Sequence, residues 1–108
     1  MSAPELTATE VAAALERGDM VAVDVREPGE WHAGHIAGAL WIPMGDFAER
    51  TPELPEAPLA IVCRSGSRSG VVADWLERSG VGAANMIGGM QAWQAAGLPI
   101  EPDDGFIA

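Results

Sequence analysis

The sequence predicts an α/β fold in which a parallel β-sheet carries helices on both faces. Short apolar segments rich in valine and isoleucine alternate with helical segments, and glycines follow several of the helices. Continuous apolar runs are typical of parallel strands, which are buried on both faces. With 108 residues, of which 48% are hydrophobic, we expect a single domain spanning residues 1–108.

The first half of the chain begins with a helix that has signals at both ends. Thr7 and Glu10 have the spacing of a capping box, which predicts a helix up to about Arg17, ended by Gly18. Two apolar runs and a turn follow the helix. They are predicted as a buried strand at 20–25 (MVAVDV), a turn with a short helix at 27–35 (EPGEWHAGH) and a second strand at 38–43 (GALWIP).

The second half continues the alternation of strands and helices. LAIVC at 59–63 predicts a buried strand, and a helix is expected at 69–80, because Val71, Val72, Trp75 and Leu76 lie on one face. The other segments are predicted as one or two helical turns at 44–50, a proline-rich acidic surface loop at 51–58, a strand at 83–87 and a helix at 89–97.

Charge and composition argue against several classes of protein. A formal net charge of −10 disfavours a nucleic-acid partner, because such binding depends on basic surfaces. The first ten residues contain no basic residue and no long apolar run, so we expect no targeting segment, and no stretch is long enough to span a membrane. A single cysteine cannot form an internal disulfide, which favours a reducing compartment and hence the cytoplasm.

The only cysteine, Cys63, ends a predicted strand and begins a polar loop, CRSGSRS. In parallel sheets, ligands bind beyond the carboxyl ends of the strands. Gly66 allows a turn with converging N–H groups, and such a turn at a helix N-terminus binds anions. These donors, with Arg64 and Arg68, predict a pKa for Cys63 below the ~8.5 of a free thiol. The alternative, a buried structural cysteine, leaves the polar residues around it unexplained.

Four segments in order resemble the motifs of the rhodanese-like sulfurtransferases in their single-domain form. They are DVRE at 24–27, EWHAGHIAGALWIP at 30–43, CRSGSRS at 63–69 and GGMQAWQAAGLP at 88–99. The resemblance covers nearly the whole chain. It implies a five-stranded parallel sheet between helices, and a cysteine that carries sulfur as a persulfide, which in this sequence is Cys63.

The length of the cysteine loop separates this family from its relatives. Four residues lie between Cys63 and Arg68, whereas cysteine phosphatases have a loop one residue longer, which makes room for a tetrahedral phosphate. A shorter loop brings its N–H groups closer to the sulfur and leaves space for one additional sulfur atom. Phosphatase and arsenate reductase functions are therefore disfavoured.

The resemblance predicts a sulfurtransferase with Cys63 as the catalytic residue. A small anionic donor such as thiosulfate supplies the sulfur, and cyanide or a thiol accepts it. The predicted substrate-binding residues are Arg64, Ser65, Gly66, Ser67, Arg68 and Ser69, whose N–H groups surround the terminal sulfur. We expect no cofactor and no metal. The alternative is a sulfur-relay or protein-binding module, which has the same residues but passes sulfur to a protein acceptor with little turnover of small donors.

Two side-chain roles stay open at this point. Arg64 and Arg68 are interpreted as ligands of the donor's sulfonate, although Arg68 is equally suited to bond loop carbonyls and rigidify the turn. The hydroxyl of Ser67 or Ser69 is suited to donate to the persulfide, although Ser69 is also a candidate cap for the following helix.

Polar and aromatic residues outside the loop are expected to be structural. Asp24 and Arg26 are expected to pair or hydrogen-bond, and two histidines alone make a weak metal site. His35 is therefore expected to make an internal hydrogen bond and His32 to be exposed. The four tryptophans are expected mostly in the core. The residues expected to carry surface charges or charges at a helix N-terminus are Glu27 and Glu30.

Overall fold

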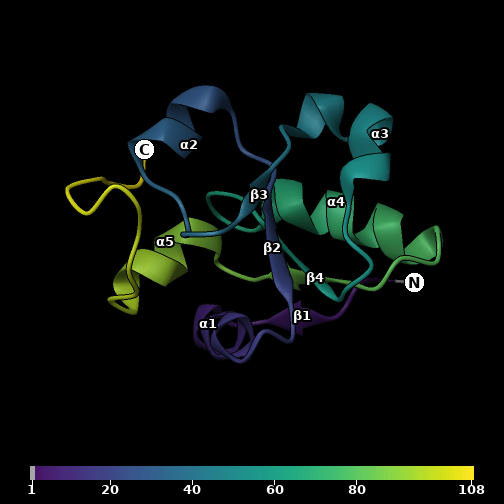
Figure 1. Cartoon of the computed structure of the whole chain (residues 1–108), viewed down its shortest axis with the longest axis horizontal. Coiled ribbons are helices and arrows are strands. Elements are labelled where there is room, and N and C mark those ends of the chain that lie inside the picture. Colours follow the sequence, from purple (N-terminus) through teal and green to yellow (C-terminus); the bar gives the residue numbers. More distant parts are fainter. Residues whose placement is uncertain (1) are drawn as a thin grey trace.

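The computed structural model describes residues 2–108, which form a five-stranded parallel sheet between two layers of helices (Figure 1). The strands lie in the order β1-β5-β4-β2-β3, and all four pairs are parallel. The strands are β1 (Glu5–Leu6), β2 (Val21–Asp24), β3 (Leu40–Trp41), β4 (Leu59–Val62) and β5 (Ala83–Met86). The helices are α1 (Ala8–Arg17), α2 (Pro28–Ala33), α3 (Phe47–Arg50), α4 (Ser67–Arg78) and α5 (Gly89–Ala95), with 3₁₀ turns η1 (Met44–Asp46) and η2 (Thr51–Glu53).

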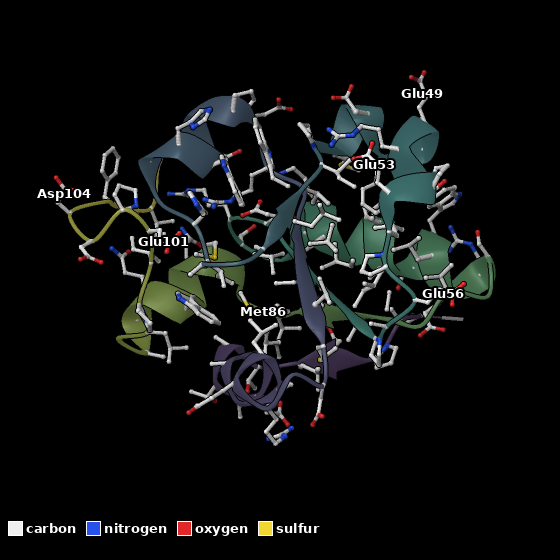
Figure 2. The ribbon with its side chains drawn as sticks, viewed as in Figure 1. Glu49, Glu53, Glu56, Met86, Glu101 and Asp104 are labelled. Carbon is white, nitrogen blue, oxygen red and sulfur yellow. The ribbon has the colours of Figure 1, made fainter. Side chains whose placement is uncertain are left out.

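The side chains of the sheet alternate between two apolar cores, which confirms the prediction of helices on both faces. On β4, Ile61 points into the core beneath α3 and α4, whereas its neighbours Ala60 and Val62 point into the core beneath α1 and α5. Figure 2 shows Met86 of β5 on the side of the sheet that faces α1 and α5. Cys63, the residue after β4, belongs to the core of α3 and α4.

Most predicted elements are present, with small differences at their ends. Thr7 and Glu10 form the predicted capping box at the start of α1, and Gly18 ends that helix with a left-handed φ of 74°. The strand predicted at 38–43 is shorter, because only the two residues of β3 pair with β2. The loop predicted at 51–58 begins with the turn η2.

One strand was missed, and the predicted start of one helix is wrong. Strand β1 is not predicted from its own residues, because two residues with a single apolar side chain show no periodicity. Helix α4 begins at Ser67, directly after Gly66, whose φ is 100°. Ser69 therefore lies inside the first turn of α4 and does not cap it.

The predicted apolar face of α4 is correct in part. Val72 and Leu76 are buried as expected, but Val71 is 58% exposed and Trp75 is 38% exposed. The buried positions follow a spacing of three and four residues that starts at Ser69. The polar residue Ser69 is thus on the inner face of the helix, and Val71 is on the outer one.

The first turn of α5 packs directly against the cysteine loop. The backbone N–H groups of Met90 and Gln91 donate to the carbonyl oxygens of Cys63 and Arg64, at 2.8 and 3.0 Å. Gly89 makes this approach possible, since its φ is 58° and a Cβ there would lie 2.6 Å from the carbonyl carbon of Arg64. Gly89, the first residue of α5, therefore permits the contact that fixes the position of the loop.

Gly89→Ala should destabilise the protein by more than about 3 kcal/mol, because it combines an unfavourable φ with overlap of backbone atoms. Gly97→Ala is the matched control, since Gly97 also has a positive φ of 72°, but a Cβ at that position would meet no atom within 4 Å. That control should cost only about 1–2 kcal/mol. Urea unfolding followed by tryptophan fluorescence measures both, and equal losses would contradict the close packing at Gly89.

Candidate active site

The sulfur of Cys63 faces hydrogen-bond donors from the loop and from α4. The backbone N–H of Gly66 donates to Sγ at 3.0 Å, and the hydroxyl of Ser69 lies 3.2 Å from it. Burial raises the pKa of the thiol, but hydrogen bonds from Ser69, Gly66 and Ser65 together outweigh burial and bring this pKa below its ordinary value. The direction agrees with the lowered pKa predicted from the sequence.

Cys63 is completely buried in this structure. A thiol buried among apolar groups alone has a raised pKa. The hydrogen-bond donors around Cys63 reverse this direction, so its surroundings differ from those of a structural cysteine. Because the side chain has no exposed surface, a donor molecule contacts Sγ only after atoms that cover the sulfur have moved.

Arg68 is engaged in a salt bridge with α2. Its two terminal nitrogens donate to Glu30 Oε1 and Oε2, each at 2.8 Å. Glu30 also accepts from the backbone N–H of Glu27 at the start of α2, so it is the helix N-terminal charge that was expected. The pKa of Glu30 is lowered to about 2, chiefly by the hydrogen bond from Arg68. In this arrangement Arg68 braces the start of α4 against α2, a contact that the sequence does not reveal.

The remaining polar side chains of the loop are exposed. The Nε of Arg64 donates to the main-chain oxygen of Ala108 at 2.9 Å. The hydroxyls of Ser65 and Ser67 are 3.3 Å apart and both residues are exposed. Of the two hydroxyls considered from the sequence, the one that contacts Sγ is therefore that of Ser69.

Asn85 of β5 is a residue of the site that sequence reasoning missed. Its Nδ2 donates to the carbonyl oxygen of Gly66 at 3.0 Å, and its Oδ1 accepts from the hydroxyl of Ser69 at 2.6 Å. The residue is only 8% exposed. The signal that could have found it is an amide within an otherwise apolar strand, because a buried amide requires hydrogen-bond partners.

A buried ion pair lies at the end of the neighbouring strand β2. Arg26 Nη2 lies 2.8 Å from Asp24 Oδ2, and the two side chains are 0% and 1% exposed. The same nitrogen donates to the carbonyl oxygen of Gly34, at the end of α2. The structural pairing expected of Asp24 and Arg26 is confirmed, and it attaches α2 to the sheet beside the cysteine loop.

His35, Trp31 and Trp41 form a stack between α2 and β3, and His32 meets Trp41 edge-on. His35 Nδ1 lies 2.8 Å from the carbonyl oxygen of Trp31, and His32 is exposed, so both expectations are confirmed. The Trp31 ring stacks on His35 and on Trp41. Trp93 is the one buried tryptophan, so the expectation of tryptophans mostly in the core is wrong. Among the described residues, no group of three potential ligands is arranged to hold a metal.

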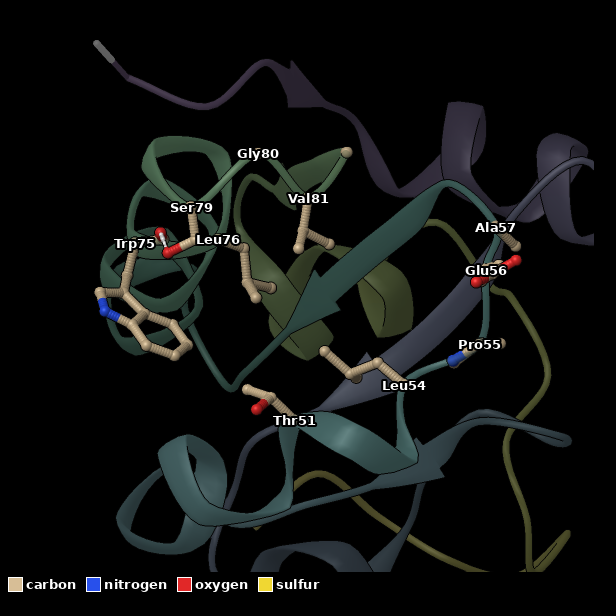
Figure 3. Close-up of a pocket in the computed structure, with 11 residues that line it drawn as sticks. Thr51, Leu54, Pro55, Glu56, Ala57, Trp75, Leu76, Ser79, Gly80 and Val81 are labelled. Carbon is tan, nitrogen blue, oxygen red and sulfur yellow. Dashed lines mark hydrogen bonds between the residues drawn. The ribbon is translucent and has the colours of Figure 1, made fainter.

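A pocket of about 440 Å³ lies at the amino ends of β4 and β5, opposite the end of the sheet that carries Cys63 (Figure 3). Its walls include Leu76 and two segments, 54–57 and 79–82, that precede β4 and β5, whereas Cys63 follows β4. The lining contains no cysteine, histidine or arginine. This pocket therefore offers neither a thiol nor a cation for an anionic substrate, and the candidate site stays at the cysteine loop.

Comparison with known proteins shows the family to which the chain is similar. The family model for the rhodanese-like domain matches residues 7–96. A protein of Allochromatium vinosum named sulfurtransferase is 39% identical over 89 residues, which cover 81% of this chain and 83% of the relative. The thiosulfate sulfurtransferase GlpE of Pseudoalteromonas translucida is 34% identical over 84 residues, covering 76% and 80%. The crystal structure of a rhodanese-related protein from Thermoplasma volcanium superposes with a TM-score of 0.84 at 28% identity, covering 90% and 96%.

The fold and the loop define a class of α/β protein in which a single thiol sits among N–H donors at the carboxyl end of a central strand. The chain belongs to the rhodanese-like domain family, which confirms the resemblance drawn from its four motifs. Proteins named sulfurtransferases are among its relatives. In the part of the chain that the structure describes, no helix has the length and apolar character needed to cross a membrane.

Glu30→Gln should lower the free energy of unfolding by roughly 1–2 kcal/mol at neutral pH, because the salt bridge with Arg68 loses its charge. The pKa of Glu30 is about 2 in the folded protein and 4.5 ordinarily, so the pair stabilises above pH 4.5 and this stabilisation is lost as the pH falls toward 2. The difference between wild type and variant should shrink over that window in urea unfolding experiments. Glu53→Gln, which removes an exposed pair with Arg50, is the control and should change little. A stability difference between wild type and Glu30→Gln that does not change with pH would contradict this role of the salt bridge.

Ser69→Ala should raise the pKa of Cys63 by about one pH unit, because the thiolate loses a side-chain hydrogen bond. The ultraviolet absorbance of the thiolate reports this pKa directly, since the chain has one cysteine and no tyrosine. Ser79→Ala, which removes a hydroxyl bonded to the carbonyl of Trp75 at the far end of α4, should leave it unchanged. The same pKa in Ser69→Ala as in wild type would show that Ser69 does not act on the sulfur.

Proposed function

We propose that this protein is a sulfurtransferase that moves a sulfane sulfur from thiosulfate, or a similar small anionic donor, to cyanide or a thiol. The observation that carries the proposal is the pair of donors at Cys63 Sγ, the N–H of Gly66 at 3.0 Å and the hydroxyl of Ser69 at 3.2 Å. They favour an anionic sulfur at this position. The name of the GlpE relative supports thiosulfate as the class of donor.

The proposed reaction has two covalent steps. In the first, the Cys63 thiolate attacks the outer sulfur of thiosulfate; a bond forms between Sγ and that sulfur, and the sulfur–sulfur bond of thiosulfate breaks. The electron pair of the broken bond leaves with sulfite, and the protein holds Cys63–S–S⁻. In the second step the acceptor attacks the terminal sulfur, and the electron pair of the persulfide bond returns to Sγ as the thiolate.

The terminal sulfur of the persulfide carries the negative charge, and the N–H groups of residues 64–69 are the proposed donors to it. Two features support this role. Gly66 has a left-handed φ of 100°, which turns the loop, and α4 starts immediately afterwards, so its N-terminal dipole end lies at the loop. Arg64, which is exposed, is the guanidinium that we propose for the sulfonate of the donor.

A protein acceptor is the second candidate, and the complete burial of Cys63 favours it. In that case a partner protein opens the site and takes the sulfur, with little turnover of small molecules. The chain has a single cysteine, so no second thiol of its own resolves the persulfide as a disulfide. In both cases the persulfide persists until an external acceptor arrives.

Incubation with thiosulfate should add the mass of one sulfur atom to the protein, and dithiothreitol should remove it, because Cys63 forms a reducible persulfide. Cys63→Ser should stay folded, with unchanged circular dichroism, and should take up no sulfur. Intact-protein mass spectrometry measures the loading, and thiocyanate formation from thiosulfate and cyanide measures turnover.

Loading without turnover would favour the protein acceptor over cyanide or a small thiol. A wild-type protein that gains no sulfur yet hydrolyses aryl phosphates would overturn the proposal and point to phosphatase chemistry. Retained sulfur transfer by Cys63→Ser would exclude this cysteine as the carrier.

A further inference from the structure

The hydroxyl of Ser69 lies between two acceptors but has one hydrogen to donate. Its oxygen is 2.6 Å from Asn85 Oδ1 and 3.2 Å from Cys63 Sγ. A serine hydroxyl is a single donor and otherwise an acceptor. At any moment, therefore, Ser69 donates to Asn85 or to the sulfur, and not to both.

The amide of Asn85 cannot remove this competition by turning over. Its Nδ2 donates to the carbonyl oxygen of Gly66 at 3.0 Å, and the turned amide would place Oδ1 against that carbonyl. Ser69 is 0% exposed and Asn85 is 8% exposed. Because a buried acceptor without a donor is costly, Asn85 Oδ1 depends on the Ser69 hydrogen.

The state of Cys63 decides which acceptor receives the hydrogen. When Cys63 is a thiol, its S–H is available to Ser69 Oγ, and Ser69 donates to Asn85, so every group has a partner. When Cys63 is a thiolate, the hydroxyl turns to Sγ, and Asn85 Oδ1 loses its donor. When Cys63 carries a second sulfur, the charge moves to that outer atom, and the hydroxyl is free to return to Asn85.

We propose that Asn85 is a positioning residue that competes with the Cys63 thiolate for the Ser69 hydrogen, and thereby favours both the thiol and the persulfide over the free thiolate. Asn85 acts through Ser69 and does not itself touch the sulfur that reacts. The part of this proposal that concerns the persulfide rests on the proposed function, whereas the part that concerns the thiol does not.

Glu30 and Arg68, which form an ion pair near Cys63, keep their charge while the thiol titrates. The pKa of Glu30 is about 2, and that of Arg68 is raised above its ordinary value by the hydrogen bond between them. The charges of Glu30 and Arg68 therefore stay constant while Asn85 and the sulfur compete for the Ser69 hydrogen. The charged groups of the elements around Cys63 are Arg64 from the loop, Arg68 from α4, Glu30 from α2, and Asp24 paired with Arg26 at the end of β2. Beside Asn85, Glu5 of β1 and Asp74 of α4 line the same small cavity.

The test compares Asn85→Leu in the wild-type protein and in Ser69→Ala, with the pKa of Cys63 measured by thiolate absorbance. Competition predicts that Asn85→Leu lowers this pKa by about 0.5 to 1 pH unit, the size of one exchanged hydrogen bond. It also predicts no fall in the Ser69→Ala background, where no hydrogen is contested. If Asn85 only braced the loop through Gly66, its loss would loosen the N–H donors and raise the pKa instead. A rise, no change, or an equal fall in both backgrounds would overturn the proposal.

A control variant, a substitute variant and a resonance measurement complete the test. Gln94→Leu, an amide-to-leucine change at an exposed position of α5, should leave the pKa of Cys63 unchanged. If Asn85→Leu does not fold, Asn85→Ala serves the same comparison. In the wild-type protein, the side-chain amide resonance of Asn85, the one asparagine in the chain, should shift with the midpoint of the Cys63 titration. An Asn85 amide resonance whose chemical shift does not change as Cys63 titrates would also overturn the proposal.

Sulfur loading separates this inference from the proposed function. With thiosulfate and sulfite at fixed concentrations, Asn85→Leu should shift the equilibrium toward free thiolate by about 2- to 10-fold. If the wild-type protein takes up no sulfur, the proposed function fails, and the thiolate absorbance still decides whether Asn85 competes for the hydrogen. If the wild-type protein loads sulfur and the absorbance result has the wrong sign, the proposed function stands and this inference fails.

Discussion

A loop that turns its N–H groups toward one sulfur must turn its carbonyl groups away, and those buried carbonyls need donors of their own. Here the carbonyls of Cys63 and Arg64 accept from the first N–H groups of α5, and that of Gly66 accepts from Asn85. The close approach of α5 in turn requires Gly89. The buried amide on β5 and the first turn of α5, which Gly89 allows to come close, together supply the donors that these carbonyl groups need.

In this acidic protein, hydrogen-bond dipoles rather than net positive charge lower the pKa of the Cys63 thiol. The formal net charge is −10, and side chains such as Glu49, Glu56 and Asp104 extend from the periphery in Figure 2. Next to the site, Arg68 is paired with Glu30, so its charge is largely compensated there. The fixed donors at Sγ are then what stabilises the thiolate, and fixed dipoles need no reorganisation when charge develops.

Sequence reasoning identified what depends on local pattern and missed what depends on contacts between distant segments. The capped helix α1 and the strand that ends at the cysteine follow from spacing and apolar runs. The contacts of Asn85 and Glu30 with the loop join residues 19 and 38 positions apart, and no local pattern encodes such a separation. Strand β1 is similarly defined by its pairing with β5, and the orientation of Trp75 by where α4 begins, so neither was available from the residues alone.

Burial of Cys63 and the hydrogen bonds to its sulfur act in opposite directions on the pKa of the thiol. Burial separates Cys63 from water and raises the pKa of its thiol. Hydrogen bonds from Ser69, Gly66 and Ser65 lower this pKa. A site with burial alone would hold an unreactive thiol, and a site with donors alone would leave the sulfur open to competing reactions. The hydroxyl of Ser69 is buried and contacts both the sulfur of Cys63 and the side chain of Asn85. The polar network beneath the loop therefore sets how much of the donors' stabilisation the thiolate receives.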